Sequence, residues 1–563
     1  MKKASKKTKI LVFVLTIIGV VVVPSLLICS PPSTVTMRNL GSTPLMGWNG
    51  WNRFRCNDEV NERLIKETAD ALVTTGMKEA GYAYIVLDDC WQIERNSWET
   101  IVADPKKFPS GMKALGDYIH AKGLKFGIYT SAGVLTCEGR PGSFGHEEKD
   151  IDRYTEWGVD FIKVDWCGVD DLDALVQYDL WRGLISKSSR PVVFSIAMPN
   201  LGKERPWLWG RAISQMWRVN NDIRDSWESI ASIIDVNEPL ARYADQNHRN
   251  DPDMLVVGVG NLTAEEQKSH LSMWAMMGAP LIAGNDIRTM TDTTREILTN
   301  QEAIEIDQDA TESQGKQIQK SQDQEVWTKK LAQSGANAVA LFNRGNYPSI
   351  ITVKWSDIGY LAPVLIRDVW EHKWLGFSQK KFSREVPAHG VLLLKVYGLI
   401  TNKGKTTQLP PLHTTSDGFL SDQEWIYAEN GHGPVEKDMS NGETDSGDGS
   451  TLSIRGQEFN KGLGVHSYSN ILYRLGDKCR LFHAVVGIDD EVEDKKTGAI
   501  FRVYGDGQRL YDSGIVTMSF MPLPISVDIS GNRNLILQVV SSDPDTTQYQ
   551  HADWADARVF CNQ

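Results

Sequence analysis

Between residues 38 and 309, short apolar runs alternate with longer segments in which apolar residues recur every three or four positions. The short runs are typical of buried strands, and the longer spacing is typical of amphipathic helices. The clearest helices are expected at 61–76, 111–122 and 264–277. The expected strands are 45–48, 84–87, 125–129, 161–164, 191–196, 216–219, 255–257 and 280–283. Strands alternating with helices in this way predict a (β/α)8 barrel. A doubly wound open sheet is the alternative, but no GxGxxG follows the first strand, which argues against a dinucleotide site.

The pattern changes near residue 310. From 310 to 398, short apolar runs separated by turns replace the helical spacing, which predicts an antiparallel β-sandwich. Residues 399–416 are polar and contain Pro410 and Pro411, so they are expected to be a linker. Residues 417–563 return to an all-β pattern and predict a second sandwich module. Two charged loops in that module, 442–450 and 489–498, are interpreted as solvated turns in preference to calcium sites.

The N-terminus has the pattern of a targeting segment. Five lysines occupy the first nine residues, and an almost continuous apolar run follows to residue 28. Residues 1–30 are therefore expected to be a signal peptide or an N-terminal anchor. Cys29 resembles a lipoprotein acylation site, although Ile28 stands where a small residue is usual. A cleaved signal, a lipid anchor and an uncleaved anchor all predict an exported protein, whether secreted, periplasmic or attached to the cell surface through its N-terminus alone.

Charge and cysteine content narrow the function. A net charge of −12 argues against a nucleic-acid partner, because phosphate binding favours a basic surface. The sequence has no CxxC pair or histidine cluster that would suggest zinc, and no metal or cofactor is expected. Disulfides are the better interpretation in an oxidising compartment. Apart from Cys29, the cysteines are Cys56, Cys90, Cys137, Cys167, Cys479 and Cys561, and six cysteines allow fifteen pairings.

The strand at 161–164 carries the first candidate chemistry. Lys163 and Asp165 are two positions apart and so point to the same face of the strand. A buried lysine and aspartate are costly unless they pair with each other or serve a site. A structural ion pair is one interpretation. The other follows from the barrel, in which active sites lie at the carboxyl ends of the strands. Polar residues gather at these ends, namely Asp88, Asp89, Tyr129, Asp165, Arg218 and Asp222.

Several ordered motifs resemble a known family. They are TPLMGWNGW at 43–51, LDDCW at 87–91, KFPSGM at 107–112, GLKFGIY at 123–129, GRPGS at 139–143, KVDWC at 163–167 and NDPDML at 250–255. Over residues 38–397 the chain resembles glycoside hydrolase family 27, which contains α-galactosidases and α-N-acetylgalactosaminidases. The segments LSD at 420–422, GPVE at 433–436, KGLGVH at 461–466, VYGDG at 503–507, LYDSG at 510–514 and HADWADA at 551–557 resemble the NPCBM carbohydrate-binding module.

The resemblance implies a retaining exo-glycosidase that removes terminal α-linked galactose from glycans by double displacement. Asp165 matches the family's nucleophile, and Lys163 is expected to keep it ionised. Asp222 matches the acid/base and is expected to have a raised pKa. Arg218 is expected to hydrogen-bond the sugar near the nucleophile. The resemblance also implies that galactose-containing glycans bind the C-terminal module.

Further roles follow from the same resemblance. Asp88 and Asp89 match the pair that holds the sugar's 4- and 6-hydroxyls. Trp51 would supply an apolar wall, and Tyr129 and Asp253 would complete the pocket. The implied disulfides are Cys56–Cys90 and Cys137–Cys167, which leaves Cys479 with Cys561.

One stretch departs from the family pattern. Family α-galactosidases carry Cys-Glu-Trp after the fifth strand, where this chain has FSIAMPN at 194–200. Ala197 or Met198 takes the place of the glutamate that meets the sugar's 2-position. A small residue there leaves room for an N-acetyl group, whereas methionine would fill the space with an adaptable apolar side chain. The alternatives to an α-galactosidase are therefore an α-N-acetylgalactosaminidase, a β-L-arabinopyranosidase and, less favoured, a non-catalytic glycan-binding adhesin.

Overall fold

The computed structural model describes residues 40–198, 204–309, 311, 313–400, 412–442, 444–492, 498–542 and 550–561. The expected targeting segment at 1–30 and most of the expected linker lie outside these residues. Within the described ranges, none of the helices combines the length and the apolar character needed to cross a bilayer.

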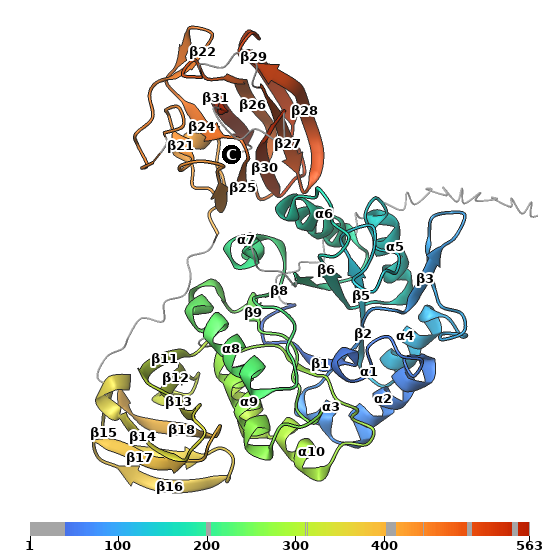
Figure 1. The fold of residues 1–563 in the computed structure, drawn as a ribbon, viewed down its shortest axis with the longest axis vertical. Coiled ribbons are helices and arrows are strands. Elements are labelled where there is room, and N and C mark those ends of the chain that lie inside the picture. The colour runs from blue at the N-terminus through green and yellow to red at the C-terminus, as the bar shows by residue number, and fades with distance from the viewer. Residues whose placement is uncertain are drawn as a thin grey trace, which may run out of the picture. The chain divides into compact units, whose positions relative to one another are not determined.

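Eight parallel strands curl into a ring with helices around it (Figure 1). In spatial order they are β10 (Leu281–Ala283), β1 (Met46–Asn49), β2 (Tyr84–Leu87), β5 (Lys125–Ser131), β6 (Phe161–Asp165), β7 (Val193–Ala197), β8 (Met216–Arg218) and β9 (Arg249–Asp251). A parallel bridge between Leu255 and Ala283 joins the chain just beyond β9 to β10 and closes the ring. The predicted (β/α)8 barrel is confirmed.

Helices lie between most of the barrel strands, and three of them match the expected segments closely. The helices are α1 (Trp51–Phe54), α2 (Glu62–Thr74), α3 (Met77–Ala80), α4 (Met112–Ala121), α5 (Glu147–Trp157), α6 (Ala174–Lys187), α7 (Pro206–Ile213), α8 (Trp227–Asn237), α9 (Ala264–Met277), α10 (Asp292–Leu298) and α11 (Gln301–Gln308). A short hairpin, β3 (Gln92–Arg95) and β4 (Ile101–Ala103), follows β2. Helix starts have local causes: the Asp173 side chain accepts a hydrogen bond from the Val176 amide and so caps α6.

The strand expected at 255–257 was misplaced. The barrel strand is β9, six residues earlier, and Leu255 contributes only the closing bridge. β9 consists of Arg249, Asn250 and Asp251, all buried although polar. Asn250 accepts from the Trp217 indole at 3.0 Å, and its own amide donates to the Leu240 carbonyl at 2.8 Å. Such satisfied polar groups can form an interior strand that apolar patterning does not reveal.

An antiparallel sandwich follows the barrel, as predicted. One sheet has the order β11 (Lys316–Ser321), β12 (Gln324–Lys330), β13 (Ala336–Asn343), β18 (Val391–Ile400), β15 (Tyr360–Asp368) and β16 (Lys373–Ser378). The other pairs β14 (Ser349–Lys354) with β17 (Lys381–Val386). The two sheets enclose a separate apolar cluster that includes Val339, Ile351 and Leu394.

The C-terminal region is a second sandwich of two antiparallel sheets, also as predicted. The first contains β21 (Glu436–Lys437), β24 (Gly462–His466), β31 (His551–Cys561), β26 (Cys479–Ile488) and β29 (Leu523–Asp528), with β19 (Gly418–Phe419) paired to β31. The second contains β20 (Tyr427–Glu429), β25 (Ser469–Arg474), β30 (Asn534–Ser541), β27 (Gly498–Gly505) and β28 (Gln508–Thr517). A small hairpin of β22 (Leu452–Ile454) and β23 (Gln457–Phe459) completes it. The disulfide Cys479–Cys561 joins β26 to β31. We refer to residues 417–561 as the C-terminal module.

Candidate active site

The register of the barrel strands places polar residues on common rows. Asp165 is the last residue of β6 and lies between Ser131 of β5 and Ala197 of β7. One row below, Lys163 lies between Tyr129 and Ser195. Side chains of adjacent parallel strands at the same row point the same way, so these groups face a common space at the carboxyl end of the barrel.

Lys163 pairs directly with Asp88. The Lys163 Nζ lies 2.9 Å from the Asp88 carboxylate, which also accepts from the Asn49 side-chain amide at 2.6 Å. Burial by itself would lower the pKa of Lys163, but the charges of Asp88 and Asp165 raise it above its ordinary value. Lys163 is therefore a fixed cation at the base of the site.

Asp165 is 9% exposed and is held from two sides. The Tyr129 hydroxyl donates to one carboxylate oxygen at 3.0 Å, and the Trp166 amide donates to the other at 2.8 Å. Burial raises the pKa of Asp165 to about 6, although the charge of Lys163 and the bond from Trp166 act in the opposite direction. The expectation that Lys163 keeps this carboxylate ionised thus holds in direction but is outweighed by desolvation.

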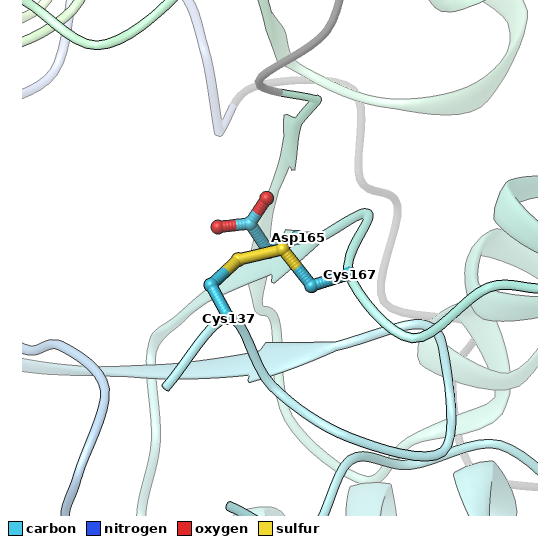
Figure 2. A group of neighbouring side chains, drawn as sticks. All are labelled: Cys137, Asp165 and Cys167. Atoms are coloured by element: carbon cyan, nitrogen blue, oxygen red, sulfur yellow. A yellow bond between two sulfur atoms is a disulfide. The ribbon is translucent and has the colours of Figure 1, made fainter. Parts of the chain in front are cut away.

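A disulfide lies against this carboxylate (Figure 2). The two sulfurs of Cys137–Cys167 and a carboxylate oxygen of Asp165 lie within 4.8 Å of one another. The Tyr129 hydroxyl also lies 3.4 Å from the Cys137 Sγ. Because both sulfurs are bonded to each other, they offer no thiolate to a metal ion. The disulfide instead braces the loop that follows the strand.

Asp222 lies across the site in the loop after β8. Its carboxylate accepts from the Arg218 guanidinium at 3.1 Å, and its side chain is 62% exposed. The same guanidinium nitrogen lies 3.1 Å from the Asp253 carboxylate. Partial burial acts to raise the pKa of Asp222, but the Arg218 charge outweighs it and holds that pKa below its ordinary value. This differs from the expected raised pKa and follows from the direct contact with a buried arginine.

The loop after β9 completes this side. Asp253 has a left-handed backbone with φ of 80°, accepts from the Ile223 amide at 2.8 Å, and is buried. Its pKa is raised by burial, which the charge of Arg218 partly offsets. Asp251 lies on the same row as Arg218, and burial raises its pKa to about 6. Asp222 and Asp253 therefore share one arginine, whose charge also acts on Asp251.

Asp89 lies in the turn after β2, and Trp51 lies at the start of α1. Both carboxylate oxygens of Asp89 accept from backbone amides, those of Cys90 at 2.6 Å and Glu138 at 3.1 Å, and burial raises its pKa. The chain turns here, with a positive φ at Cys90, and the disulfide Cys56–Cys90 ties it to the loop after α1. Trp51, at the start of α1, is half-buried, and its amide donates to Asn49.

Ala197 and Met198 have different surroundings. Ala197 is 2% exposed and shares the row of Asp165, whereas Met198 has no exposed surface and packs within the apolar barrel core. Of these two candidates, Ala197 is the one that the register aligns with the site. The register of β6 and β7 ends at Ala197 and does not place Met198 on this row.

Sequence reasoning missed Asn49, Ser131 and Asp251 as members of this site. Asn49 orients Asp88, Ser131 bonds the backbone of Cys167, and Asp251 lies beside Arg218. Each occupies the last position of its strand, so the rule that singled out Asp165 could have found all three.

Three family models match the chain. One described as "Alpha galactosidase A" matches residues 43–309, one described as "Alpha galactosidase C-terminal beta sandwich domain" matches 321–396, and "NPCBM/NEW2 domain" matches 416–560. "Alpha-galactosidase A" of Cellvibrio japonicus is 42% identical over 402 residues, which cover 68% of this chain and 98% of that protein. "Alpha-galactosidase 2" of Arabidopsis thaliana is 43% identical and covers 66% of this chain and 93% of its own length. The crystal structure of α-galactosidase I from Mortierella vinacea is 36% identical, covers 65% of this chain and 99% of its own, and superposes with a TM-score of 0.62. The resemblance stated from the motifs is confirmed.

Proposed function

The chain belongs to the α-galactosidase A family, and on that premise we propose that it hydrolyses terminal α-linked galactose by a retaining mechanism. The observation that supports this most is the placement of Asp165. It ends a barrel strand, is braced by Tyr129 and a disulfide, and faces a site whose other side carries Asp222 on Arg218. Glycosidases canonically use two carboxyl groups that flank the scissile bond, and Asp165 and Asp222 are candidates for this pair.

In the first step, a carboxylate oxygen of Asp165 forms a bond to the anomeric carbon while the bond to the leaving-group oxygen breaks. Asp222 gives its proton to that oxygen, so the leaving group departs as a neutral alcohol. The galactose is then held on Asp165 as an ester. In the second step, water loses a proton to Asp222 and attacks the same carbon, which releases galactose and restores both carboxyl groups.

The proton distribution of the free enzyme has to change for this chemistry. Arg218 favours the ionised form of Asp222, while burial favours the protonated form of Asp165. A bound sugar would exclude water from Asp222 and raise its pKa, and Arg218 can transfer its contact to Asp253, which lies equally close. We therefore propose that substrate binding moves the single proton from Asp165 to Asp222.

Sugar recognition is assigned to the opposite rim. We propose that Asp88 and Lys163, which form one ion pair, bond the sugar hydroxyls, that Asp89 contributes at the same rim, and that Trp51 and Tyr129 line its apolar face. Arg218 and Asp253 would close the pocket from the far side.

Ala197 changes the surroundings that the site would offer to the 2-position of the sugar. A methyl group replaces a charged acceptor there, so a 2-hydroxyl gains no ionic bond and an N-acetyl group meets little bulk. This observation favours α-N-acetylgalactosaminide as the second substrate to examine. The retained acidic pair Asp88-Asp89 favours a sugar with a 6-hydroxyl over an arabinopyranoside.

Steady-state rates on aryl α-galactoside, aryl α-N-acetylgalactosaminide and aryl β-L-arabinopyranoside test the proposal. We expect the highest kcat/KM on the first, with galactose released as the α-anomer when the reaction is followed by proton NMR. Higher turnover of the second would reassign the specificity, and release of the β-anomer would contradict the retaining mechanism.

The C-terminal module and the disulfides extend the proposal. A module of the NPCBM type implies a glycan ligand, for which we propose galactose-containing chains. Three disulfides support an oxidising compartment, and we propose that the protein is exported.

A further inference from the structure

Helix α6, which follows the strand carrying Asp165, packs against the β20-β25-β30-β27-β28 sheet of the C-terminal module. Three residues of that sheet, Leu472, Tyr504 and Ile536, belong to the apolar cluster of the barrel and not to the module's own core. Domains that move relative to one another usually have interfaces that are smaller and more polar than obligate interfaces. The shared core indicates a fixed attachment.

Backbones approach closely at this interface. A Cβ on Gly183 of α6 would lie 2.8 Å from the Asp506 carbonyl oxygen. A Cβ on Gly507, whose φ is +73°, would lie 2.1 Å from the Leu180 amide nitrogen. Real Cβ atoms do not tolerate such distances, so glycine at both positions lets the Asp506-Gly507 turn lie directly on the helix.

A buried ionic group fixes the same contact. Arg182, whose side chain is 5% exposed, bonds Asp179 of its own helix at 2.7 Å and also bonds Asp506 of the module. Asn534 of the module donates to Asp179 at 2.7 Å. A buried arginine between two carboxylates is stable only while all partners stay in place.

Asp173, at the start of α6, connects this interface to the active site. One carboxylate oxygen caps the helix, and the other accepts from Tyr468, from Asn470 at 2.8 Å and from Gln538 at 3.3 Å. All three of these donors come from the module. The side-chain bonds that hold the outer oxygen of Asp173 thus depend on the docked module.

The loop between Asp165 and Asp173 carries the disulfide that touches the proposed nucleophile. Trp166 lies 5.3 Å from Tyr178 of α6 between ring centroids, and Cys167 is bonded to Cys137 beside Asp165. A shift at the start of α6 would therefore reach both residues that follow Asp165.

We propose that the C-terminal module holds this loop in its working position, with Tyr468 and Asn470 as positioning residues that act through Asp173. The inference rests on the proposed glycosidase function. It gives the module a role in the turnover of small substrates. Glycan binding by the module would not explain that role.

The test uses the full chain with the double variant Tyr468→Phe/Asn470→Ala and the single variant Tyr468→Phe, which removes only a hydroxyl. On an aryl α-galactoside too small to reach the module, we expect kcat to fall between about threefold and a hundredfold with a smaller change in KM. Amide hydrogen exchange should accelerate across residues 166–173. Tyr511→Phe, on β28 and packed against the module's own core, is the matched control and should leave both quantities unchanged.

Wild-type kcat together with wild-type exchange in both variants would overturn the proposal. If the double variant does not fold, the single variant decides. If the wild type hydrolyses no aryl α-galactoside, the proposed function fails, while hydrogen exchange still tests whether the module holds the loop.

Discussion

The Tyr129 hydroxyl donates to the Asp165 carboxylate at 3.0 Å. This bond stabilises the ionised form of a carboxyl that burial drives towards protonation. Tyr129→Phe should therefore raise the pKa of Asp165 above about 6 and lower kcat/KM by about tenfold to a hundredfold. Initial rates measured from pH 4 to pH 8 would check this. An unchanged profile would mean that the bond does not affect the ionisation of Asp165.

The pH dependence of the wild type follows from the same pair. One proton is shared by Asp165, with a pKa raised to about 6, and Asp222, with a pKa below its ordinary value. The reactive form has one proton on the pair, so kcat/KM should be greatest below pH 6 and fall about tenfold per pH unit above it. A profile of kcat/KM against pH tests this, and a plateau extending to pH 8 would contradict it.

Asp165→Asn should lower turnover and raise stability at pH 7. We expect turnover to fall by at least about a thousandfold, because the proposed nucleophile is lost, while the proposed glycan binding by the C-terminal module stays unchanged. The folded pKa is raised from 3.8 to about 6, so the folded state binds more protons than the unfolded state between these values. The free energy of unfolding therefore falls as pH rises through this window, and the ionised group costs about 3 kcal/mol at pH 7.

The variant removes that cost. Asp165→Asn should melt at a higher temperature than the wild type at pH 7 and close to it at pH 4. Calorimetry at the two pH values measures the difference. If the variant and the wild type melt at the same temperature at both pH values, Lys163 already compensates the charge of Asp165.

Ala197→Glu restores a charged acceptor on the row of Asp165. It should raise the kcat/KM ratio of aryl α-galactoside to aryl α-N-acetylgalactosaminide by about tenfold or more, because a bond to the 2-hydroxyl is gained and room is lost. Met198→Leu is the matched control, since Met198 lies in the core and should affect stability more than this ratio.

Removal of the disulfide Cys137–Cys167 and removal of Cys479–Cys561 should differ in their effect on kcat. Replacing Cys137 and Cys167 by serine loosens the loop against Asp165 and should lower both kcat and stability, the latter by about 2–4 kcal/mol. Replacing Cys479 and Cys561 should lower stability while leaving kcat at 25 °C close to the wild type. Equal kinetic losses in both variants would contradict a specific role for the first disulfide.

Sequence patterning predicted the barrel well because its strands are short, apolar and flanked by amphipathic helices. It missed β11, an edge strand of sequence KQIQKS whose side chains are mostly polar and exposed, so that it has little apolar signal. It misplaced β9, whose side chains are polar although buried, and whose partners, such as Trp217 for Asn250, are known only from the folded chain.

The site was predicted from strand ends and from family motifs, which named Asp165, Asp222 and Arg218. The electrostatics could not be predicted. That Lys163 pairs with Asp88, 75 positions away, and that Arg218 lowers the pKa of Asp222 depend on distances that only the folded chain defines. The attachment of Asp173 to the C-terminal module was equally hidden, because its donors lie about 300 residues later in the sequence.

The glycines at the contact between α6 and the turn at Asp506 also bear on how such proteins diversify. A chimera that joined this barrel to a foreign sandwich would leave Arg182 facing a surface without Asp506, and any bulkier turn would collide with Leu180. Exchange of modules between relatives would then succeed only when the helix surface is exchanged with its partner. A working exchange would therefore have to transfer helix α6 together with the sandwich.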